Sequence, residues 1–504
     1  MKQLIYQLLP RLWGNGKFSA INTGSLQYFK EGLGVGYVWC TGVVRHATTK
    51  ADGGCTPSHP QIVKGSAGSP YAITDYYDVN PYLAEDPERR MEEFRALIDR
   101  IHAAGMKVLI DFVPNHVARD YSGKAAPEGV RRLGQDDDTS VHWAPENDFY
   151  YYPGEALRLP NPCDGPAYQE YPARASGNCF SAHPALTDWY ETVKLNYCPW
   201  HTGTWDKMLH IVRFWASMGV DGFRCDMVEL VPWEFMKWLI AEVRRDFPET
   251  FFVAEVYEKE KYRLYVEEVG FNLLYDKSGL YDSLRAITCD GASARRITGD
   301  WQFLGNLQPR MLNFLENHDE QRIASDFFCG SAQGGYAALG VSLLLNTAPF
   351  MLYFGQEIGE RGMDDEPFSG VNGRTSIFDW WTVESLRRLK EWTGDHRKGL
   401  KASEREVLKR YREVLDLALT PAFAEGATYD LCYCQDGHFD RDRHFAWLRS
   451  DGKKTWLLAA NFGAAAEMTV RIPPEALKYL GIKAVRTVYT VPVGERDFVY
   501  LPVE

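Results

Sequence analysis

Four short stretches of this chain constrain its fold more than any other feature. Each is an apolar run that ends in polar residues able to take part in catalysis, namely Asp, Glu, Asn or His. In a (β/α)8 barrel the strands fill the core, while their carboxyl ends and the following loops build the active site. An α/β fold of the TIM-barrel type is therefore predicted, with a site at the strand ends. The stretches are DFVPNH (111–116), GVDGFRCD (219–226), FFVAEVY (251–257) and FLENHDEQR (314–322).

Helices and strands alternate around these stretches. Asp86, Pro87 and Glu88 give a helix N-cap, a first-turn proline and a first-turn acid, and apolar residues then recur at helical spacing up to Gly105. Such alternation is typical of a parallel sheet. The predicted strands are 107–113, 220–226 and 251–256, with further strands at 36–40, 310–315 and 350–354 and a first strand before Pro10; the predicted helices include 206–218, 232–246 and 403–419.

Two regions break this rhythm. Residues 117–186 are rich in Gly, Pro, Asp, Tyr and Asn without a helical period, which predicts an inserted loop-rich subdomain after the third strand. Residues 427–504 contain short alternating runs at 444–448, 455–461, 469–472 and 485–489, which predict a C-terminal antiparallel β-sandwich domain. The barrel itself is expected to comprise residues 1–116 and 187–426.

Composition excludes several classes of function. The net charge of −12 argues against nucleic acid as a partner, because a polyanion needs a basic face. No apolar run reaches the ~18 residues of a membrane span. The N-terminus lacks the pattern of a signal peptide, which favours a cytoplasmic protein. Aromatic residues make up 14% and fit either a large core or stacking platforms for sugar rings.

The ten cysteines are dispersed, and none is part of a paired CxxC unit, so a zinc site is not expected. Dispersed thiols favour a reducing compartment. Cys163 and Cys179 share the loop-rich region and could pair in an oxidising one.

Three acids follow predicted strand ends and would face one barrel mouth: Asp226, Glu255 and Asp319. Arg224 precedes Asp226 by two residues, so both side chains share one face of the strand, and the guanidinium would keep that carboxylate ionised. Glu255 follows an apolar run that favours a protonated general acid. An ionised acid beside a protonated one is what glycoside cleavage with retention needs.

Two histidines, His116 and His318, also fall at strand ends. We expect them to donate hydrogen bonds to substrate hydroxyls rather than to transfer protons. The chain contains neither an HExxH nor a GxSxG pattern, so zinc peptidase and serine hydrolase chemistry have no support.

Together these motifs resemble those of the α-amylase family of glycoside hydrolases (family 13). The four stretches match its conserved regions in order, and residues 71–81 and 354–359 match segments after the second and eighth strands. The resemblance implies that Asp226 is the nucleophile, Glu255 the acid/base and Asp319 the acid that stabilises the transition state. It further implies that Arg224 orients the nucleophile, and that the sugar before the scissile bond is bound by Tyr71, His116 and His318.

Asn115 matches a calcium ligand of the family. Its partners would come from the inserted subdomain, where Asp164 and Asp188 are candidates. An asparagine after a proline equally caps a loop, so both interpretations of Asn115 stay open. No organic cofactor is expected.

The resemblance implies a retaining hydrolase of α-1,4-glucosidic bonds in starch, glycogen or maltodextrins. The chain departs from typical α-amylases after the nucleophile, where Met227 to Leu230 replace a Lys-His pair and Glu229 would bind the leaving-group sugar. A transglycosylase or an α-glucosidase acting on short α-glucosides is therefore the alternative. A non-catalytic relative would have lost one or more of the acids, and all three are present.

Overall fold

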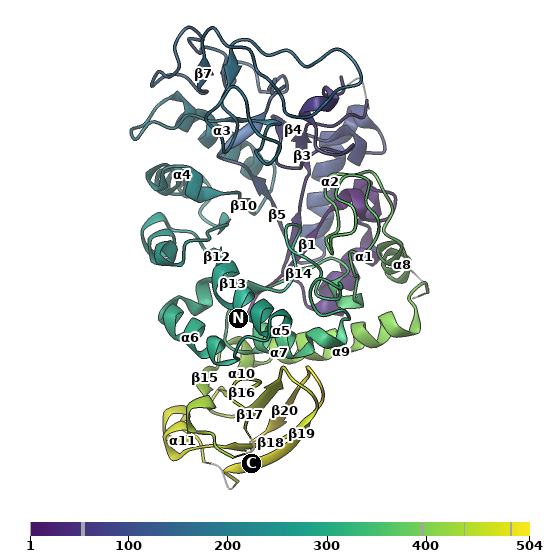
Figure 1. The fold of residues 1–504 in the computed structure, drawn as a ribbon, viewed down its shortest axis with the longest axis vertical. Helices are drawn as coiled ribbons and strands as arrows, with labels where there is room; N and C mark the ends of the chain where they lie inside the picture. Colours follow the sequence, from purple (N-terminus) through teal and green to yellow (C-terminus); the bar gives the residue numbers. More distant parts are fainter. Residues whose placement is uncertain (1, 52–55, 395–397, 438, 484–485, 504) are drawn as a thin grey trace.

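A computed structural model describes residues 2–51, 56–394, 398–437, 439–483 and 486–503. Eight parallel strands close into a barrel in the order β1-β14-β13-β12-β11-β10-β5-β2 (Figure 1). The predicted TIM-barrel fold is thus confirmed. The strands are β1 (Leu4–Leu8), β2 (Tyr37–Cys40), β5 (Lys107–Phe112), β10 (Gly222–Cys225), β11 (Phe251–Ala254), β12 (Leu273–Tyr275), β13 (Met311–Phe314) and β14 (Phe350–Tyr353).

Helices surround the barrel, and their apolar faces supply its outer core. In α2, for example, Phe94, Leu97, Ile98 and Ile101 are buried at helical spacing. The α-helices up to the end of the barrel are α1 (Thr23–Gln27), α2 (Arg90–Ala103), α3 (Gly203–Ser217), α4 (Trp233–Asp246), α5 (Asp282–Cys289), α6 (Arg295–Leu304), α7 (Tyr336–Leu344), α8 (Glu384–Trp392) and α9 (Ala402–Ala418); the short α10 (Pro421–Ala424) follows, and α11 (Pro474–Leu480) lies in the C-terminal domain. Within the described part of the chain, no helix has the length and apolar character needed to cross a bilayer.

Strand β12 has no counterpart among the predicted strands. It has only three residues and lies between two π-helical turns, so neither its length nor its flanks distinguish it in the sequence. In the barrel it pairs with β11 and β13 and so completes the ring between the acid/base strand and the strand before Asp319.

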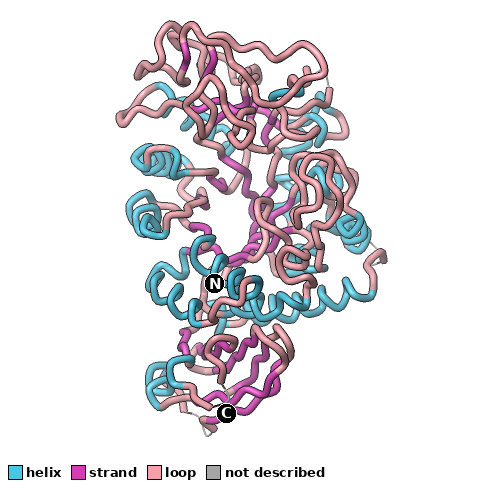
Figure 2. Tube along the Cα trace, viewed as in Figure 1, coloured by secondary structure: helices cyan, strands magenta, loops and turns pink. Residues whose placement is uncertain are grey.

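The region between β5 and α3 is mostly loop, as Figure 2 shows at the top of the molecule. Short antiparallel pairs organise it: β6 (His116–Ala118) with β9 (Thr192–Lys194), and β7 (Tyr151–Tyr152) with β8 (Ala173–Arg174). Cys163 and Cys179 are both free thiols. A third antiparallel pair precedes this region, β3 (Val44–His46) with β4 (Ile73–Val79).

An antiparallel β domain ends the chain below the barrel in Figure 1, with α9 between them. Its four-stranded sheet has the order β15 (Ala427–Asp430), β16 (His444–Ser450), β17 (Thr455–Asn461), β20 (Phe498–Pro502), and a second sheet pairs β18 (Ala466–Arg471) with β19 (Val488–Val493). The predicted antiparallel domain is thus present. Of the strand predicted at 485–489, residue 485 lies outside the described residues.

Candidate active site

One arginine holds two of the three acids together. Arg224 is buried in β10, and its Nη1 donates a hydrogen bond of 2.5 Å to Oδ1 of Asp226. Its Nη2 lies 2.9 Å from Oε2 of Glu255, an ion pair whose alignment falls short of a hydrogen bond. Nε donates to the hydroxyl of Tyr275 at 3.2 Å. Since β10 and β11 are parallel neighbours, their carboxyl ends bring these acids to one mouth.

Glu255 is more polar in its surroundings than its apolar strand suggests. The run Phe251–Ala254 lines the barrel core, but the carboxyl group leaves it for the mouth. There Oε2 accepts a hydrogen bond from the amide of Met227 at 3.0 Å, and Oε1 accepts one from the hydroxyl of Tyr257 at 2.6 Å. The expected apolar environment is therefore wrong for the carboxyl group itself, which is held by oriented donors.

The backbone is strained directly after Asp226. Met227 has φ 44° and ψ 45°, a left-handed conformation that non-glycine residues seldom adopt. The amide of this same residue donates the hydrogen bond to Glu255. Strain at such a position is characteristic of functional sites, because the surrounding structure has to impose it.

Asp319 faces the open pocket. Its side chain is 45% exposed, and Oδ2 lies 3.1 Å from Nε2 of His318. Although it is exposed to the pocket, it sits within the barrel mouth, where lost hydration and the charge of Glu255 raise its pKa to about 7, against the opposing charge of Arg224. Asp319 can therefore hold a proton near neutral pH when no substrate is bound.

The three acids lie close enough to affect one another's ionisation, and together they retain a proton. Burial raises the pKa of Asp226 well above its usual value, and the charge of Glu255 adds to the shift; Arg224, which was expected to keep this carboxylate ionised, opposes the shift without cancelling it. Because one guanidinium cannot neutralise three carboxylates, ionisation of all three in this pocket is unfavourable. A cluster that stays partly protonated at neutral pH has the proton that a general acid must give away.

Tyr71 and His318 form one hydrogen-bonded unit. Their rings stack at 5.2 Å, and the Tyr71 hydroxyl lies 2.5 Å from Nε2 of His318 and 3.4 Å from Oδ1 of Asp111. Gln7 donates to Nδ1 of His318 at 2.8 Å, which places the ring proton on Nε2, toward the pocket. Burial and then Arg224 lower the pKa of His318 well below its usual value, so the ring is neutral.

His116 also lies in the pocket wall, 5.2 Å from the ring of Trp189. Burial and the charges of Lys194 and Lys64 lower its pKa to about 3, so it too is neutral and suited to hydrogen bonding.

Glu229 is engaged with the backbone of the loop after Glu255. Its carboxylate accepts hydrogen bonds from the amides of Tyr257 at 2.7 Å and Glu258 at 3.2 Å. Contact with the leaving-group sugar stays a prediction, but the structure adds a positioning role, since these bonds fix the loop that carries Tyr257.

The ammonium of Lys194 contacts the side-chain oxygen of Asn115, the residue that was predicted to bind calcium. Lys194 in β9 donates to Oδ1 of Asn115 and, at 2.9 Å, to the carbonyl of Leu230. Neither candidate partner acid completes a ligand set there: Asp164 is exposed, and Asp188 accepts a hydrogen bond from the amide of Ala185. The donor set around Asn115 thus does not fit calcium, because a fixed cation already binds its oxygen.

The three acids share a cavity of about 360 Å³, the size of a small-ligand pocket. Tyr257 was open to prediction, because it follows Glu255 by two residues on the same strand end. The other residues carry no local signal, because they lie in loops or, for Thr192, in the short strand β9. Lining residues that the sequence did not single out are Lys64, Ser69, Trp189, Glu191, Thr192, Tyr257, Ile377 and Phe378.

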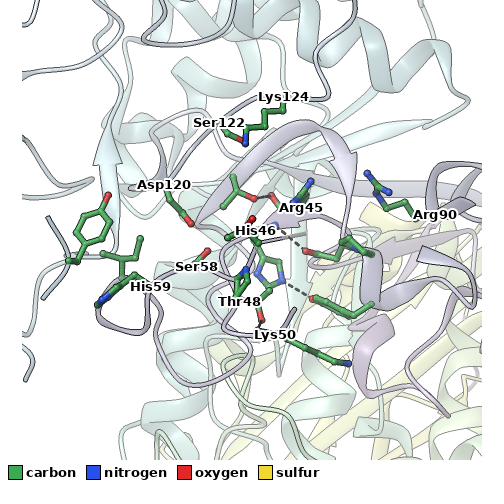
Figure 3. Close-up of a pocket in the computed structure, with 18 residues that line it drawn as sticks. Arg45, His46, Thr48, Lys50, Ser58, His59, Arg90, Asp120, Ser122 and Lys124 are labelled. Carbon is green, nitrogen blue, oxygen red and sulfur yellow. Dashed lines mark hydrogen bonds between the residues drawn. The ribbon is translucent and has the colours of Figure 1, made fainter. Parts of the chain in front are cut away.

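A second cavity of about 560 Å³ lies between the β3–β4 pair and the inserted region. Figure 3 shows Arg45, Arg90 and Lys124 around it, with Asp120 among them. It contains none of the residues predicted to act on a substrate, so we place the reaction in the smaller pocket.

Comparison with known proteins agrees with the fold and the motifs. The family model "Alpha amylase, catalytic domain" matches residues 14–414. Alpha-amylase 3 of Dictyoglomus thermophilum is 24% identical over 328 residues, which cover 62% of this chain and 59% of that protein. The probable oligo-1,6-glucosidase 3 of Bacillus subtilis is 23% identical, with 91% of this chain and 90% of that protein covered.

The chain spans about half of the length of the curated alpha-amylases that it matches. Among solved structures, an alpha-amylase from Lactobacillus plantarum superposes with a TM-score of 0.64 at 19% identity, covering 100% of this chain and 99% of that one. This similarity establishes the common fold.

Proposed function

The chain belongs to the alpha-amylase family of glycoside hydrolases, and from this premise we propose that it cleaves α-1,4-glucosidic bonds of starch, glycogen or maltodextrins with retention. The observation that carries the proposal is the single guanidinium that contacts both Asp226 and Glu255. Retaining enzymes need their two carboxyl groups about 5 Å apart, and a shared arginine keeps the pair close.

In the first step a proton passes from Glu255 to the glycosidic oxygen while Asp226 attacks the anomeric carbon. The bond between that carbon and the leaving oxygen breaks, and an ester to Asp226 forms. The Tyr257 hydroxyl and the Met227 amide hold the Glu255 carboxyl group, and Nη1 of Arg224 holds Asp226.

In the second step water attacks the same carbon and gives its proton to Glu255, so the ester breaks and Asp226 is released. Positive charge develops on the sugar in both transition states, and Asp319 is placed to stabilise it once it is ionised. Tyr71, His116 and His318, all neutral, would bind hydroxyl groups of that sugar.

Two experiments test this proposal. A proton NMR time course on maltoheptaose should show the α-anomer as first product, and the β-anomer would overturn the assignment. The Asp226→Asn variant should lose at least ~10⁴-fold in kcat, since removal of the nucleophile costs about 10⁶-fold in a serine protease, which also reacts through a covalent intermediate. Circular dichroism should show that it keeps the wild-type fold.

A transglycosylase or an α-glucosidase acting on short α-glucosides is the second candidate. Glu229 in place of the usual Lys-His pair favours it, because the leaving-group side differs from that of typical α-amylases. A relative with nearly full coverage carries the name oligo-1,6-glucosidase. Digestion of maltoheptaose and isomaltose separates the candidates: products longer than the substrate indicate transfer, and glucose from isomaltose indicates α-1,6 cleavage.

We also propose that the enzyme needs no calcium at Asn115, because the Lys194 ammonium supplies the cation there. Metal analysis of the purified protein, with activity before and after EDTA, tests this. Bound calcium together with loss of activity in EDTA would overturn it.

A further inference from the structure

We propose that the pocket is closed on the side of the sugar that receives the nucleophile, so that the enzyme acts only on the non-reducing ends of glucan chains. This inference rests on the proposed function and specifies its mode of attack. The closing element is the segment 58–69, which we call the rim. It lies in the long connection between β3 and β4, just before Tyr71.

The two ends of the pocket are distinguished by their residues. Tyr71, His116 and Trp189 line the pocket, with the rings of His116 and Trp189 5.2 Å apart, and we assign to them the end that holds the sugar bound to Asp226. Met227 and Tyr257 line the other, next to Glu255, where the leaving group departs. An enzyme that cuts inside a long chain needs a groove that continues past both ends.

An ion pair joins two walls at the first end. Lys64 of the rim places its Nζ 3.0 Å from Oε1 of Glu191, next to β9 of the inserted region, and 5.5 Å from the ring centre of Tyr190. Both charged residues line the pocket. The Glu191 side chain is only 5% exposed, so separating the pair would leave a buried charge and is strongly unfavourable.

Hydrogen bonds extend this junction along the rim. The Gln61 side chain donates to the backbone carbonyl of Asn161 at 2.9 Å and accepts from the amide of Tyr168 at 2.8 Å. The backbone carbonyl of Gln61 accepts from the Asn161 side chain at 3.1 Å. His59 adds a bond of 2.9 Å to the carbonyl of Pro166. The rim and the inserted region are therefore joined by several bonds rather than by one contact.

The far part of the rim is tied to the loop after β14. The amide of Ala67 donates to the carbonyl of Phe378 at 2.8 Å, and Trp380 donates through its indole to the carbonyl of Ser66 at 3.1 Å. Gly65 permits this approach: its φ is +64°, and a Cβ there would lie 2.3 Å from the Phe378 oxygen. Among the described residues, the rim is thus bonded both to the inserted region and to the loop after β14, and we assign these three joined segments as the wall that stops a further chain of sugars.

The Lys64 ammonium gives this wall a chemical role. Glu191 accepts from one of its three N–H donors, and we assign a second donor to a sugar hydroxyl in the pocket. A chain end presents such a free hydroxyl, whereas an internal residue carries another sugar in its place. Lys64 is therefore the residue to which we assign recognition of the chain end, and Glu191 positions it.

Wild-type protein tests the inference with two substrates: maltoheptaose, and maltoheptaose with a 4,6-ethylidene group on its non-reducing-end glucose. Early products of the free substrate should be one short sugar released from the non-reducing end and the single shortened chain that remains. The blocked substrate should react at least 100-fold more slowly. Equal rates, or an early mixture of all lengths, would overturn the inference. Hydrolysis of p-nitrophenyl α-glucoside or α-maltoside tests the function separately, because an endo-acting family member still cleaves an activated short substrate.

A variant tests the wall itself. Gln61→Ala removes two side-chain bonds across the junction and should raise the ratio of blocked to free substrate turnover at least fivefold. Gln169→Ala is the matched control, since Gln169 is exposed and, among the described residues, its side chain bonds to the nearby carbonyl of Ala167 rather than across the junction. An unchanged ratio in a folded Gln61→Ala protein would contradict the proposed role of the rim.

Discussion

Replacement of Lys194 by methionine gives the sharpest test of how the inserted region is held without a metal. The methionine keeps most of the aliphatic stem and removes the ammonium. Two acceptors then lose their donor: Oδ1 of Asn115, a residue with no exposed surface, and the carbonyl of Leu230, a residue 39% exposed.

The expected cost follows from this difference. A buried acceptor without a partner costs about 1–3 kcal/mol, whereas water can replace the donor at the exposed carbonyl. Relief from burying the ammonium offsets part of this loss, so we expect about 2 kcal/mol. Unfolding entropy is roughly 2 cal/mol/K per residue, so a protein of this size loses about 2 °C in Tm.

Thermal unfolding with EDTA and with added CaCl2 provides the measurement. Wild-type protein should unfold within 1 °C of the same temperature in both buffers, and Lys194→Met about 2 °C lower in both. Lys237→Met is the control, because its ion pair with Glu268 is exposed and such pairs contribute little. A wild-type Tm that falls several degrees in EDTA and recovers with calcium would refute the reasoning.

Two further substitutions probe the acids. Glu229→Gln weakens the hydrogen bonds to the amides of Tyr257 and Glu258, so kcat on maltoheptaose should fall about tenfold, ~1.4 kcal/mol. The fall should be much smaller on dinitrophenyl α-glucoside, whose leaving group needs no proton. Equal falls on both substrates would argue against a role of Glu229 in positioning the Tyr257 loop. Asp319 has a folded pKa of about 7, above its ordinary value, so its charge opposes folding above pH 7 and this cost disappears as pH falls toward 4. Asp319→Asn should therefore raise thermal stability at pH 8 by about 1 kcal/mol, a figure reduced for its 45% exposure, and by less at pH 5; an equal gain at both pH values would contradict this.

The barrel was predictable because four of its strands carry two signals in the sequence, an apolar run and the polar residues that follow it. Alternation along one strand likewise predicted that Arg224 contacts Asp226. In strand β12 both signals are weak: its apolar run has only three residues, and the Asp276 that follows it was not expected to act on a substrate. Its place follows only from closure of the ring, which is a property of the whole chain.

Contacts between distant segments were beyond prediction. Lysine is most often a solvated surface residue, so Lys64 and Lys194 carry no local sign that one meets Glu191 and the other Asn115. The surroundings of Glu255 illustrate the same limit, because its ion-pair partner Arg224 and its amide donor Met227 lie about 30 residues earlier in the chain.

The two lysines also suggest how this scaffold separates chemistry from specificity. The acids stand at the ends of strands whose positions are set by the main apolar core, so their geometry is rigid. The wall at the sugar end is different: Lys64 and Gln61 hold it through side-chain bonds between loops. Substitutions there can open or close the pocket without moving the acids, and on this basis we expect the length of accepted glucan to depend on the rim and the reaction type on the strands.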